Sequence, residues 1–314
     1  MADRMKLRVR RRESVADGVI SLELESMAGL PLPPWEPGAH VEVRTASGLL
    51  RNYSLCGDPA DRHTYRIAVL CVADGRGGSL ELHETAQPGS ALEIGAPKNR
   101  FPLEPADEYL FLAGGIGITP MLSMIEQAEG SGATWRLVYG GRTRTGMAFL
   151  EGLRTRYPDR VAVFADDVEG RPDVAEEVGA LRPGGLIYVC GPEGLLEVVS
   201  SVVEGAGRSD GLRFERFTGS AIETSGEPFE VELARSGVTL AVGSGETILE
   251  AIRSNGLSSS FSCESGYCGA CEATVLDGEP VHLDTYLTDQ EKEEGFTMMI
   301  CVSRCAGDLI VLDL

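Results

Sequence analysis

Short stretches in which apolar and polar residues alternate cover the first hundred positions of the chain. They lie at residues 7–9, 20–24, 40–43 and 65–69, and glycine, proline and aspartate residues separate them. Alternation places successive side chains on opposite faces of a β-strand, and the separating residues favour turns. Evenly spaced short strands without long helical patterns predict a small antiparallel β-barrel over residues 1–104.

The pattern changes in the middle third of the chain. Apolar runs at residues 109–113, 135–139, 161–164 and 186–189 alternate with helical patterns at 121–129, 148–156, 174–181 and 195–204. Such alternation is typical of a doubly wound parallel sheet that helices cover on both faces. Residues 105–222 are therefore predicted to form an α/β domain in which 186–189 is the last strand. Ligands of such sheets bind at the carboxyl ends of the strands.

The remaining residues predict a third domain of mixed α+β type. Residues 218–228 are rich in glycine, serine and threonine, as is typical of a linker. Alternation at 229–233 and 238–242 predicts a β-hairpin, and residues 247–255 have helical spacing with Gly256 as a C-terminal cap. Further strands are predicted at 272–276 and 309–312. This domain spans residues 229–314.

The net charge excludes one class of partner. The 314-residue chain carries a formal net charge of −20, and the part from Ser220 to the end contains 17 acidic and 4 basic residues. Such a surface would repel nucleic acid. The acidic third domain could be steered toward a basic partner surface, or the charge could serve solubility alone.

No segment predicts insertion into a membrane. No apolar run approaches the length of a membrane span, and the first residues lack the apolar core of a signal peptide. We expect a cytoplasmic, monomeric protein that binds neither membrane nor nucleic acid. Of eight cysteines, four are expected to be free thiols in a reducing compartment, namely Cys56, Cys71, Cys190 and Cys305.

The other four cysteines have the spacing of a metal-cluster site. Cys263, Cys268 and Cys271 form the pattern C-x4-C-x2-C, and Cys301 follows at a distance. This is the ligand pattern of a plant-type 2Fe–2S cluster. A zinc site prefers paired short spacings, and a disulfide framework belongs to small secreted domains, so both alternatives explain the pattern less well.

Two glycines allow the proposed cluster loop to fold back on itself. Gly266 and Gly269 tolerate positive φ angles and leave backbone amides free to point at the sulfur atoms. Cys305 lies shortly after Cys301 and could be imagined as an alternative ligand. A free thiol near the last strand is the simpler interpretation of Cys305.

Two motifs of the predicted barrel are suited to a flavin. Arg51, Tyr53 and Ser54 offer a cation, an aromatic ring and a hydroxyl on one predicted strand, where they can contact an isoalloxazine ring. A glycine-rich turn then enters a short helix, whose free amides can hold a phosphate. A single phosphate site favours FMN over FAD. A strand with an exposed arginine and a plain hairpin are the alternatives. The turn consists of Gly75, Arg76, Gly77, Gly78 and Ser79.

Two turns of the predicted α/β domain are candidates for a dinucleotide site. The first strand leads into a glycine turn at a helix start, where free amides can bind phosphates. The last predicted strand ends at Cys190, which a nicotinamide could approach, although a buried core thiol is the alternative. Arg142 and Arg144 could bind a 2′-phosphate, contact the adenosine of NADH or be solvated. The glycine turn consists of Gly115, Ile116, Gly117, Ile118 and Thr119.

In their order along the chain, these motifs resemble the phthalate dioxygenase reductase family, which includes vanillate O-demethylase reductases. The resemblance covers essentially the whole chain, from Arg51-Asn-Tyr-Ser-Leu to Cys301-Val-Ser-Arg and the end. It implies a flavin-binding barrel, a NAD domain and a C-terminal β-grasp ferredoxin domain. The FMN contacts implied are Arg51, Tyr53, Ser54, Ala68, Val69 and residues 75–79, and the dinucleotide contacts are residues 115–119 and Cys190.

The resemblance also implies which residues act during electron transfer. Ser54 and Cys190 lie at the positions of the flavin and nicotinamide contacts. Phe217 resembles the aromatic residue that shields the flavin until nicotinamide displaces it, although a core phenylalanine at a strand end is the alternative. Leu70 stands where the family usually has a lysine.

The sites together predict hydride transfer from NADH to FMN and single-electron transfer through the cluster to another protein. By resemblance the acceptor is a separate Rieske-type aromatic oxygenase or O-demethylase. The chain is not that oxygenase, because its four histidines lack the spacing of Rieske ligands. A reductase for a haem monooxygenase is one alternative. A non-catalytic electron-carrier or redox-sensing module is another.

Overall fold

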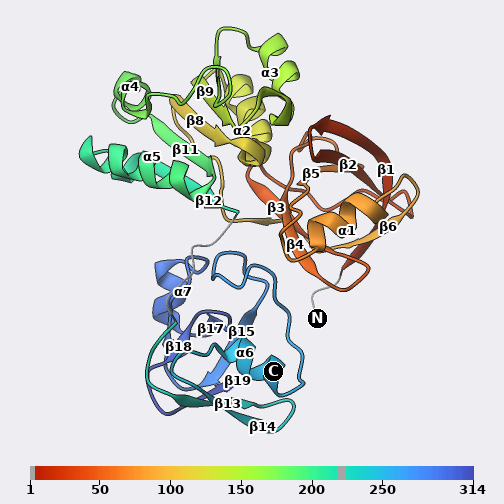
Figure 1. Ribbon diagram of the computed structural model, residues 1–314, viewed down its shortest axis with the longest axis vertical. Coiled ribbons are helices and arrows are strands. Elements are labelled where there is room, and N and C mark those ends of the chain that lie inside the picture. The colour runs from red at the N-terminus through yellow and green to blue at the C-terminus, as the bar shows by residue number, and fades with distance from the viewer. Residues whose placement is uncertain (1–3, 218–223) are drawn as a thin grey trace. The chain divides into compact units, whose positions relative to one another are not determined.

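The computed structural model describes residues 4–217 and 224–314 (Figure 1). The chain forms two compact units, one ending at Phe217 and one beginning at Thr218. The predicted linker and the predicted boundary at residue 222 fall in part on residues 218–223, which lie outside the described residues. The predicted barrel and α/β domain both belong to the first unit, where one apolar core includes Ala68 and Tyr188.

The barrel sheet is antiparallel, as predicted. Its strands follow the order β4, β3, β6, β1, β2, β5, and β7 pairs with β3. Strands β4 and β5, at the two ends of this order, contact each other, so the sheet curves toward a closed barrel. Alternating apolar residues such as Leu22 and Leu24 are fully buried inside it. The bounds are β1 Met5–Ala16, β2 Val19–Ser26, β3 Ala39–Arg44, β4 Leu50–Ser54, β5 Thr64–Leu70, α1 Gly78–Thr85, β6 Ala91–Ile94 and β7 Lys98–Asn99.

The second sheet of this unit is parallel, with the order β10, β9, β8, β11, β12. The predicted doubly wound architecture is thereby confirmed. Each predicted helix of this region is present, and short 3-10 helices follow β8 and β9. The bounds are β8 Glu108–Gly114, η1 Gly115–Gly117, α2 Ile118–Ser131, β9 Thr134–Gly141, η2 Arg144–Gly146, α3 Leu150–Arg156, β10 Val161–Ala165, α4 Val174–Ala180, β11 Leu186–Gly191, α5 Glu193–Gly205, η3 Ser209–Gly211 and β12 Leu212–Arg216.

Helices cover both faces of the parallel sheet because successive strand residues point to opposite sides. Phe111 packs in one core with α2 and α3 residues, whereas Leu110 and Leu112 pack in another with α4 and α5 residues. Within the described part of the chain, no helix combines the length and apolar character needed to cross a lipid bilayer.

The prediction that residues 186–189 form the last strand of this sheet was wrong. A fifth strand, β12, pairs in parallel with β11. Its residues alternate charged and apolar side chains, and most of them are only half-buried. An edge strand of this kind lacks the continuous apolar run by which buried parallel strands are recognised.

The second unit has a mixed sheet in the order β14, β13, β19, β15, β17, and β16 pairs with β18. The predicted hairpin is confirmed, since β13 and β14 are antiparallel, while β13 and β19 are parallel. Helix α6 begins after a capping box of Thr247 and Glu250. The bounds are β13 Phe229–Leu233, β14 Val238–Val242, α6 Ile248–Ser254, β15 Glu272–Asp277, β16 Pro280–Val281, α7 Asp289–Glu294, β17 Thr297–Met299, β18 Arg304–Cys305 and β19 Leu309–Leu312.

A buried arginine holds the start of the second unit to its interior. The Arg304 side chain is 4% exposed. Its Nη1 donates to the carbonyl oxygens of Thr224 and Glu246 at 2.8 Å, and its Nη2 donates to those of Glu227 and Gly243 at 3.0 and 3.1 Å. The guanidinium also lies 5.0 Å from the ring centroid of Phe229. Backbone carbonyls thus satisfy this buried cation.

Candidate functional site

Four cysteine side chains meet in the second unit. Cys263, Cys268 and Cys271 lie on the loop between α6 and β15, and Cys301 follows β17. All four are buried. Thiol hydrogen bonds join Cys263 to Cys268 and to Cys301, and another joins Cys271 to Cys301. The fold therefore brings together the four residues whose spacing predicted a 2Fe–2S site.

The surroundings of these four cysteines are suited to thiolates that bind a metal cluster. Hydrogen bonds from the Cys268 and Cys301 thiols hold the pKa of Cys263 well below its ordinary value, and the same contacts raise the pKa values of Cys268 and Cys301. The backbone N–H of Cys263 donates to Cys268 Sγ and that of Ser265 to Cys263 Sγ, each at 3.4 Å. Iron–sulfur clusters are held by thiolates whose sulfur atoms accept such bonds. The donor set fits the predicted cluster.

The loop depends on both glycines that the sequence suggested. Gly266 and Gly269 have φ angles of +68° and +72°. A Cβ atom on Gly269 would lie 2.2 Å from Cζ of Tyr286, so no larger residue fits. The backbone N–H of Thr285 donates to the carbonyl oxygen of Gly266 at 2.9 Å. The segment before α7 thus supports the cysteine loop directly.

In the barrel, Arg51 ties strand β4 to the glycine-rich turn. Its Nη1 donates to the carbonyl oxygen of Leu50 at 2.7 Å, and its Nη2 donates to that of Arg76 at 3.1 Å. Burial raises the pKa of the neighbouring Tyr53 hydroxyl above its ordinary value, so this hydroxyl stays protonated well into the alkaline range. The strand and the turn, which are distant in sequence, therefore lie together as a flavin site requires.

Ser54 carries a buried hydroxyl that no described residue satisfies. A buried polar atom without a partner costs free energy, and each such atom in a native structure needs an explanation. A ligand that hydrogen-bonds this Oγ would remove the cost. This orphaned hydroxyl therefore fits the predicted contact with a flavin.

Helix α1 presents its amino end to the same region. Its N-cap is Gly77, with a φ of +82°, and no side chain of residues 4–217 or 224–314 caps its first amides. These amides are therefore available to an anion. The Ser79 hydroxyl accepts a hydrogen bond from the N–H of Val72 at 3.1 Å and can still donate one. Ala68 and Val69, on the adjacent β5, are buried.

The two predicted dinucleotide segments also meet. Turn η1 follows β8, and a Cβ atom on Gly117 would lie 2.1 Å from the carbonyl oxygen of Cys190, at the end of β11. Within the described part of the chain, no side chain caps the amides of η1 or α2. Ile118 and Thr119 are buried, and the Thr119 hydroxyl donates to the carbonyl oxygen of Ile116 at 2.9 Å. Backbone amides, rather than side chains, are thus what this turn offers to phosphates.

Sequence reasoning missed Glu215, which lies opposite Cys190 in the register of β11 and β12. Its Oε2 atom is buried and has no hydrogen-bond partner among the described residues. Burial raises the pKa of this carboxyl group to about 8. The pKa of Cys190 is also raised, mainly by burial and to a smaller extent by the nearby Glu215, so this thiol is neutral. Half-buried Phe217 packs against the core that contains Cys190.

Replacing Glu215 by glutamine is expected to remove a pH-dependent part of the stability. A carboxyl whose pKa rises from 4.5 to about 8 on folding stabilises the protein fully below pH 4.5 and loses this contribution as the pH rises through about 8. The slope is at most about 1.4 kcal/mol per pH unit. The difference in melting temperature between the wild-type protein and the variant should therefore change steadily across this range. A constant difference would contradict the buried carboxyl.

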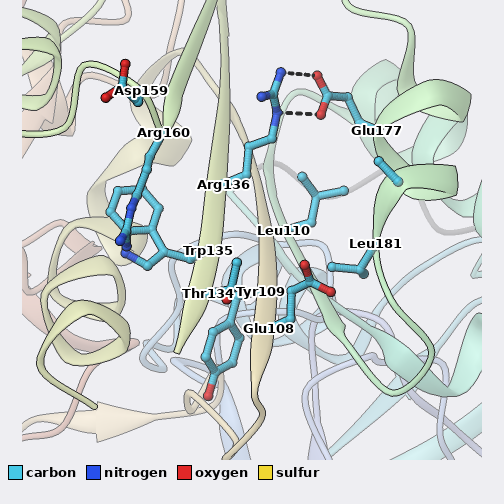
Figure 2. A pocket seen from close by; sticks show the side chains of 11 residues that line it. Glu108, Tyr109, Leu110, Thr134, Trp135, Arg136, Asp159, Arg160, Glu177 and Leu181 are labelled. Atoms are coloured by element: carbon cyan, nitrogen blue, oxygen red, sulfur yellow. Dashed lines mark hydrogen bonds and ion pairs between the residues drawn. The ribbon is translucent and has the colours of Figure 1, made fainter. Parts of the chain in front are cut away.

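A separate cavity of about 260 Å³ lies at the amino ends of β8 and β9 (Figure 2). Arg136 and Glu177 form an ion pair at its wall, with Nε and Oε2 separated by 2.6 Å. None of the predicted site residues lines this cavity. Because ligands of parallel sheets bind at the carboxyl ends, the dinucleotide is not assigned to it.

Comparison with known families matches two regions of the chain. Residues 231–306 match the 2Fe-2S iron-sulfur cluster binding domain, and residues 111–201 match the oxidoreductase NAD-binding domain. The first region contains all four clustered cysteines, and the second contains η1 and Cys190. The matches agree with the ligand chemistry inferred from each site.

Whole proteins are similar over nearly the entire chain. Phenoxybenzoate dioxygenase subunit beta of Ectopseudomonas oleovorans is 41% identical, over 95% of this chain and 94% of that protein. The solved structure of a phthalate dioxygenase reductase is 37% identical, with a TM-score of 0.74, over 99% of this chain and 98% of that one. An intact type IV self-sufficient cytochrome P450 monooxygenase is 39% identical, with a TM-score of 0.86, over 99% of this chain. There the similar region spans 41% of the longer chain.

Proposed function

Since this chain belongs to the phthalate dioxygenase reductase family, we propose that it takes electrons from NADH and delivers them to a separate oxygenase component. The observation that carries this proposal is the presence, in one chain, of a NAD-binding domain and four converging cysteines, three on one loop and the fourth after β17. A non-catalytic electron carrier would not need the NAD-binding domain. NADH is a cytoplasmic reductant, so we propose a cytoplasmic location.

We assign FMN to the barrel. Its ring would lie at Ser54, whose orphaned hydroxyl needs a partner, and its phosphate at the uncapped amino end of α1. When bound, FMN accepts a hydride and the 2Fe–2S cluster carries single electrons onward. Arg51 holds β4 and the glycine-rich turn in place for both contacts. The buried thiol of Cys190 gives the nicotinamide a small, neutral neighbour.

The acceptor is proposed to be a Rieske-type aromatic oxygenase or O-demethylase. Names of the similar proteins support this choice, since they include subunits of phenoxybenzoate and phthalate dioxygenase systems. A haem monooxygenase is the second candidate, and a specific observation favours it. The cytochrome P450 monooxygenase that matches this chain contains the similar region within its own sequence.

The proposal is tested by mixing the anaerobic protein with one equivalent of NADH. Absorbance should show bleaching of the flavin, and low-temperature electron paramagnetic resonance should then show a rhombic signal of a reduced cluster. Chromatography of the released flavin should identify FMN. A purified Rieske-type oxygenase and a purified cytochrome P450 can then be compared as acceptors by their reduction rates. An oxidised cluster after NADH addition would contradict the proposal.

Replacing Arg76 by alanine is expected to weaken retention of the flavin. A hydrogen bond to a charged group contributes about 1.5–3 kcal/mol, so the dissociation constant of FMN should rise about 10- to 100-fold. Arg10→Ala changes an exposed arginine of the same barrel and serves as the control. Flavin content after gel filtration, with titration of FMN into the stripped protein, gives the measurement. Equal affinities of both variants would remove Arg76 from the phosphate site.

A further inference from the structure

The order of strands determines where the two halves of a bound dinucleotide lie. The phosphate turn η1 follows the central strand β8, and Cys190 and Phe217 lie toward β11 and β12. With the nicotinamide on that side, the adenosine half extends over the carboxyl ends of β9 and β10. This assignment rests on the proposed function. The loops that leave β9 and β10 would then lie next to the adenosine.

These two loops begin side by side and carry opposite charges. Gly141 pairs with Ala165 in the register of β9 and β10, and the N–H of Asp166 donates to the carbonyl oxygen of Gly141 at 2.9 Å. The loop after β9 carries Arg142 and Arg144. The loop after β10 carries three carboxylates, which belong to Asp166, Asp167 and Glu169. A phosphate on the adenosine ribose would therefore lie near both the arginines of one loop and the carboxylates of the other.

One of the two arginines after β9 is already paired with a carboxylate. Nη2 of Arg144 forms an ion pair with Oε1 of Glu169, and the side chains are 39% and 28% exposed. The other carboxylate oxygen of Glu169 accepts the N–H of Ala165 at 3.1 Å, which anchors it to the end of β10. Nε of Arg144 is buried without a partner among the described residues. Glu169 thus links the Arg144 guanidinium to the end of β10.

We propose that Glu169 is the residue that makes the enzyme selective for NADH over NADPH. Its carboxylate occupies Arg144, which would otherwise bind a 2′-phosphate, and it repels the doubly charged 2′-phosphate itself. A carboxylate near the ribose accepts a hydrogen bond from the 2′-hydroxyl of NADH, whereas an available arginine accommodates NADPH. The preference for NADH then has two sources. Glu169 repels the 2′-phosphate of NADPH, and it accepts a hydrogen bond from the 2′-hydroxyl of NADH.

The test compares kcat/KM for NADH and NADPH with ferricyanide as acceptor. Glu169→Gln should raise the ratio of NADPH to NADH activity about 10- to 100-fold, the value of one charge-assisted hydrogen bond. The double variant Glu169→Gln with Arg144→Gln should lose most of this gain. Asp167→Asn removes an equal charge from an exposed position of the same loop, and its ratio should stay near that of the wild-type protein.

Binding of nucleotide fragments provides a second measurement. Calorimetry should show that adenosine 2′,5′-bisphosphate gains affinity in Glu169→Gln while AMP does not. A gain of binding cannot arise from a misfolded variant. Equal ratios for Glu169→Gln and Asp167→Asn, or a wild-type preference for NADPH, would overturn the inference. A wild-type protein that oxidises neither cofactor would instead overturn the proposed function.

Discussion

Cys268→Ser is expected to abolish electron delivery to a one-electron protein acceptor such as cytochrome c, while NADH continues to reduce the bound flavin. Cys268 lies at the centre of the cysteine loop, where its Sγ accepts the N–H of Cys263. Loss of even a supporting residue lowers metal affinity by about 10- to 100-fold, so loss of a direct ligand should exceed this range. The proposed flavin and nicotinamide sites both lie in the first unit, so the hydride step should remain.

The measurement separates two reactions of one preparation. Iron content, the resonance signal of the reduced cluster and cytochrome c reduction report the second unit, whereas anaerobic flavin bleaching reports the first. Cys305→Ser is the matched control, because among the described residues the Cys305 thiol hydrogen-bonds to backbone groups of Gly307 and Leu309 and to no other cysteine. Simultaneous loss of flavin reduction and of the cluster in Cys268→Ser would contradict the proposal that the first unit reduces the flavin independently of the cluster in the second.

Gly117→Ala is expected to damage the dinucleotide site more than any substitution of an exposed residue nearby. The added Cβ would lie 2.1 Å from the carbonyl oxygen and 2.5 Å from the carbonyl carbon of Cys190. Both are backbone atoms, which cannot rotate away. Overpacking typically costs about 1–3 kcal/mol and occasionally more, and relief here requires that η1 and the end of β11 separate. The KM for NADH should therefore rise, and the melting temperature should fall.

Gly130→Ala provides the control for Gly117→Ala. Gly130 lies on the same helix that follows the phosphate turn, and a Cβ there would meet no atom of the described residues within 4 Å. Alanine is favoured over glycine in a helix by about 1 kcal/mol, so this variant should keep the wild-type KM and melt slightly higher. Ferricyanide reduction, which bypasses the cluster, measures the KM. Wild-type kinetics in Gly117→Ala would contradict the contact between η1 and β11.

Some features of this molecule can be predicted from the sequence because they depend on residues that are close together along the chain. Strand β8 is a continuous apolar run, and buried parallel strands require such runs. The four cysteines are recognised by spacing because a small inorganic cluster restricts the ligand positions. Helix α7 was missed although Thr288 and Glu291 form a capping box, a signal that was available in the sequence.

Other features depend on pairing that spacing does not reveal. Glu215 faces Cys190 only because β12 adds to the edge of the sheet, and β12 lacks the pattern of a buried strand. The pairing of Arg144 with Glu169 likewise depends on the adjacency of β9 and β10. Sequence reasoning identified Arg144 as a candidate phosphate ligand but had no means to find the carboxylate that occupies it. Long-range contacts of single side chains are thus where the structure adds most.

The contacts of Arg304 bear on how much of the chain an isolated ferredoxin fragment needs in order to be stable. A fragment cut at the first strand, Phe229–Leu233, would lack the carbonyl oxygens of Thr224 and Glu227, which are two of the four acceptors of this guanidinium. Each lost hydrogen bond to a buried charge costs about 1.5–3 kcal/mol. We therefore expect a fragment that begins at Thr224 to be more stable than one that begins at Phe229, because it keeps all four acceptors of the Arg304 guanidinium.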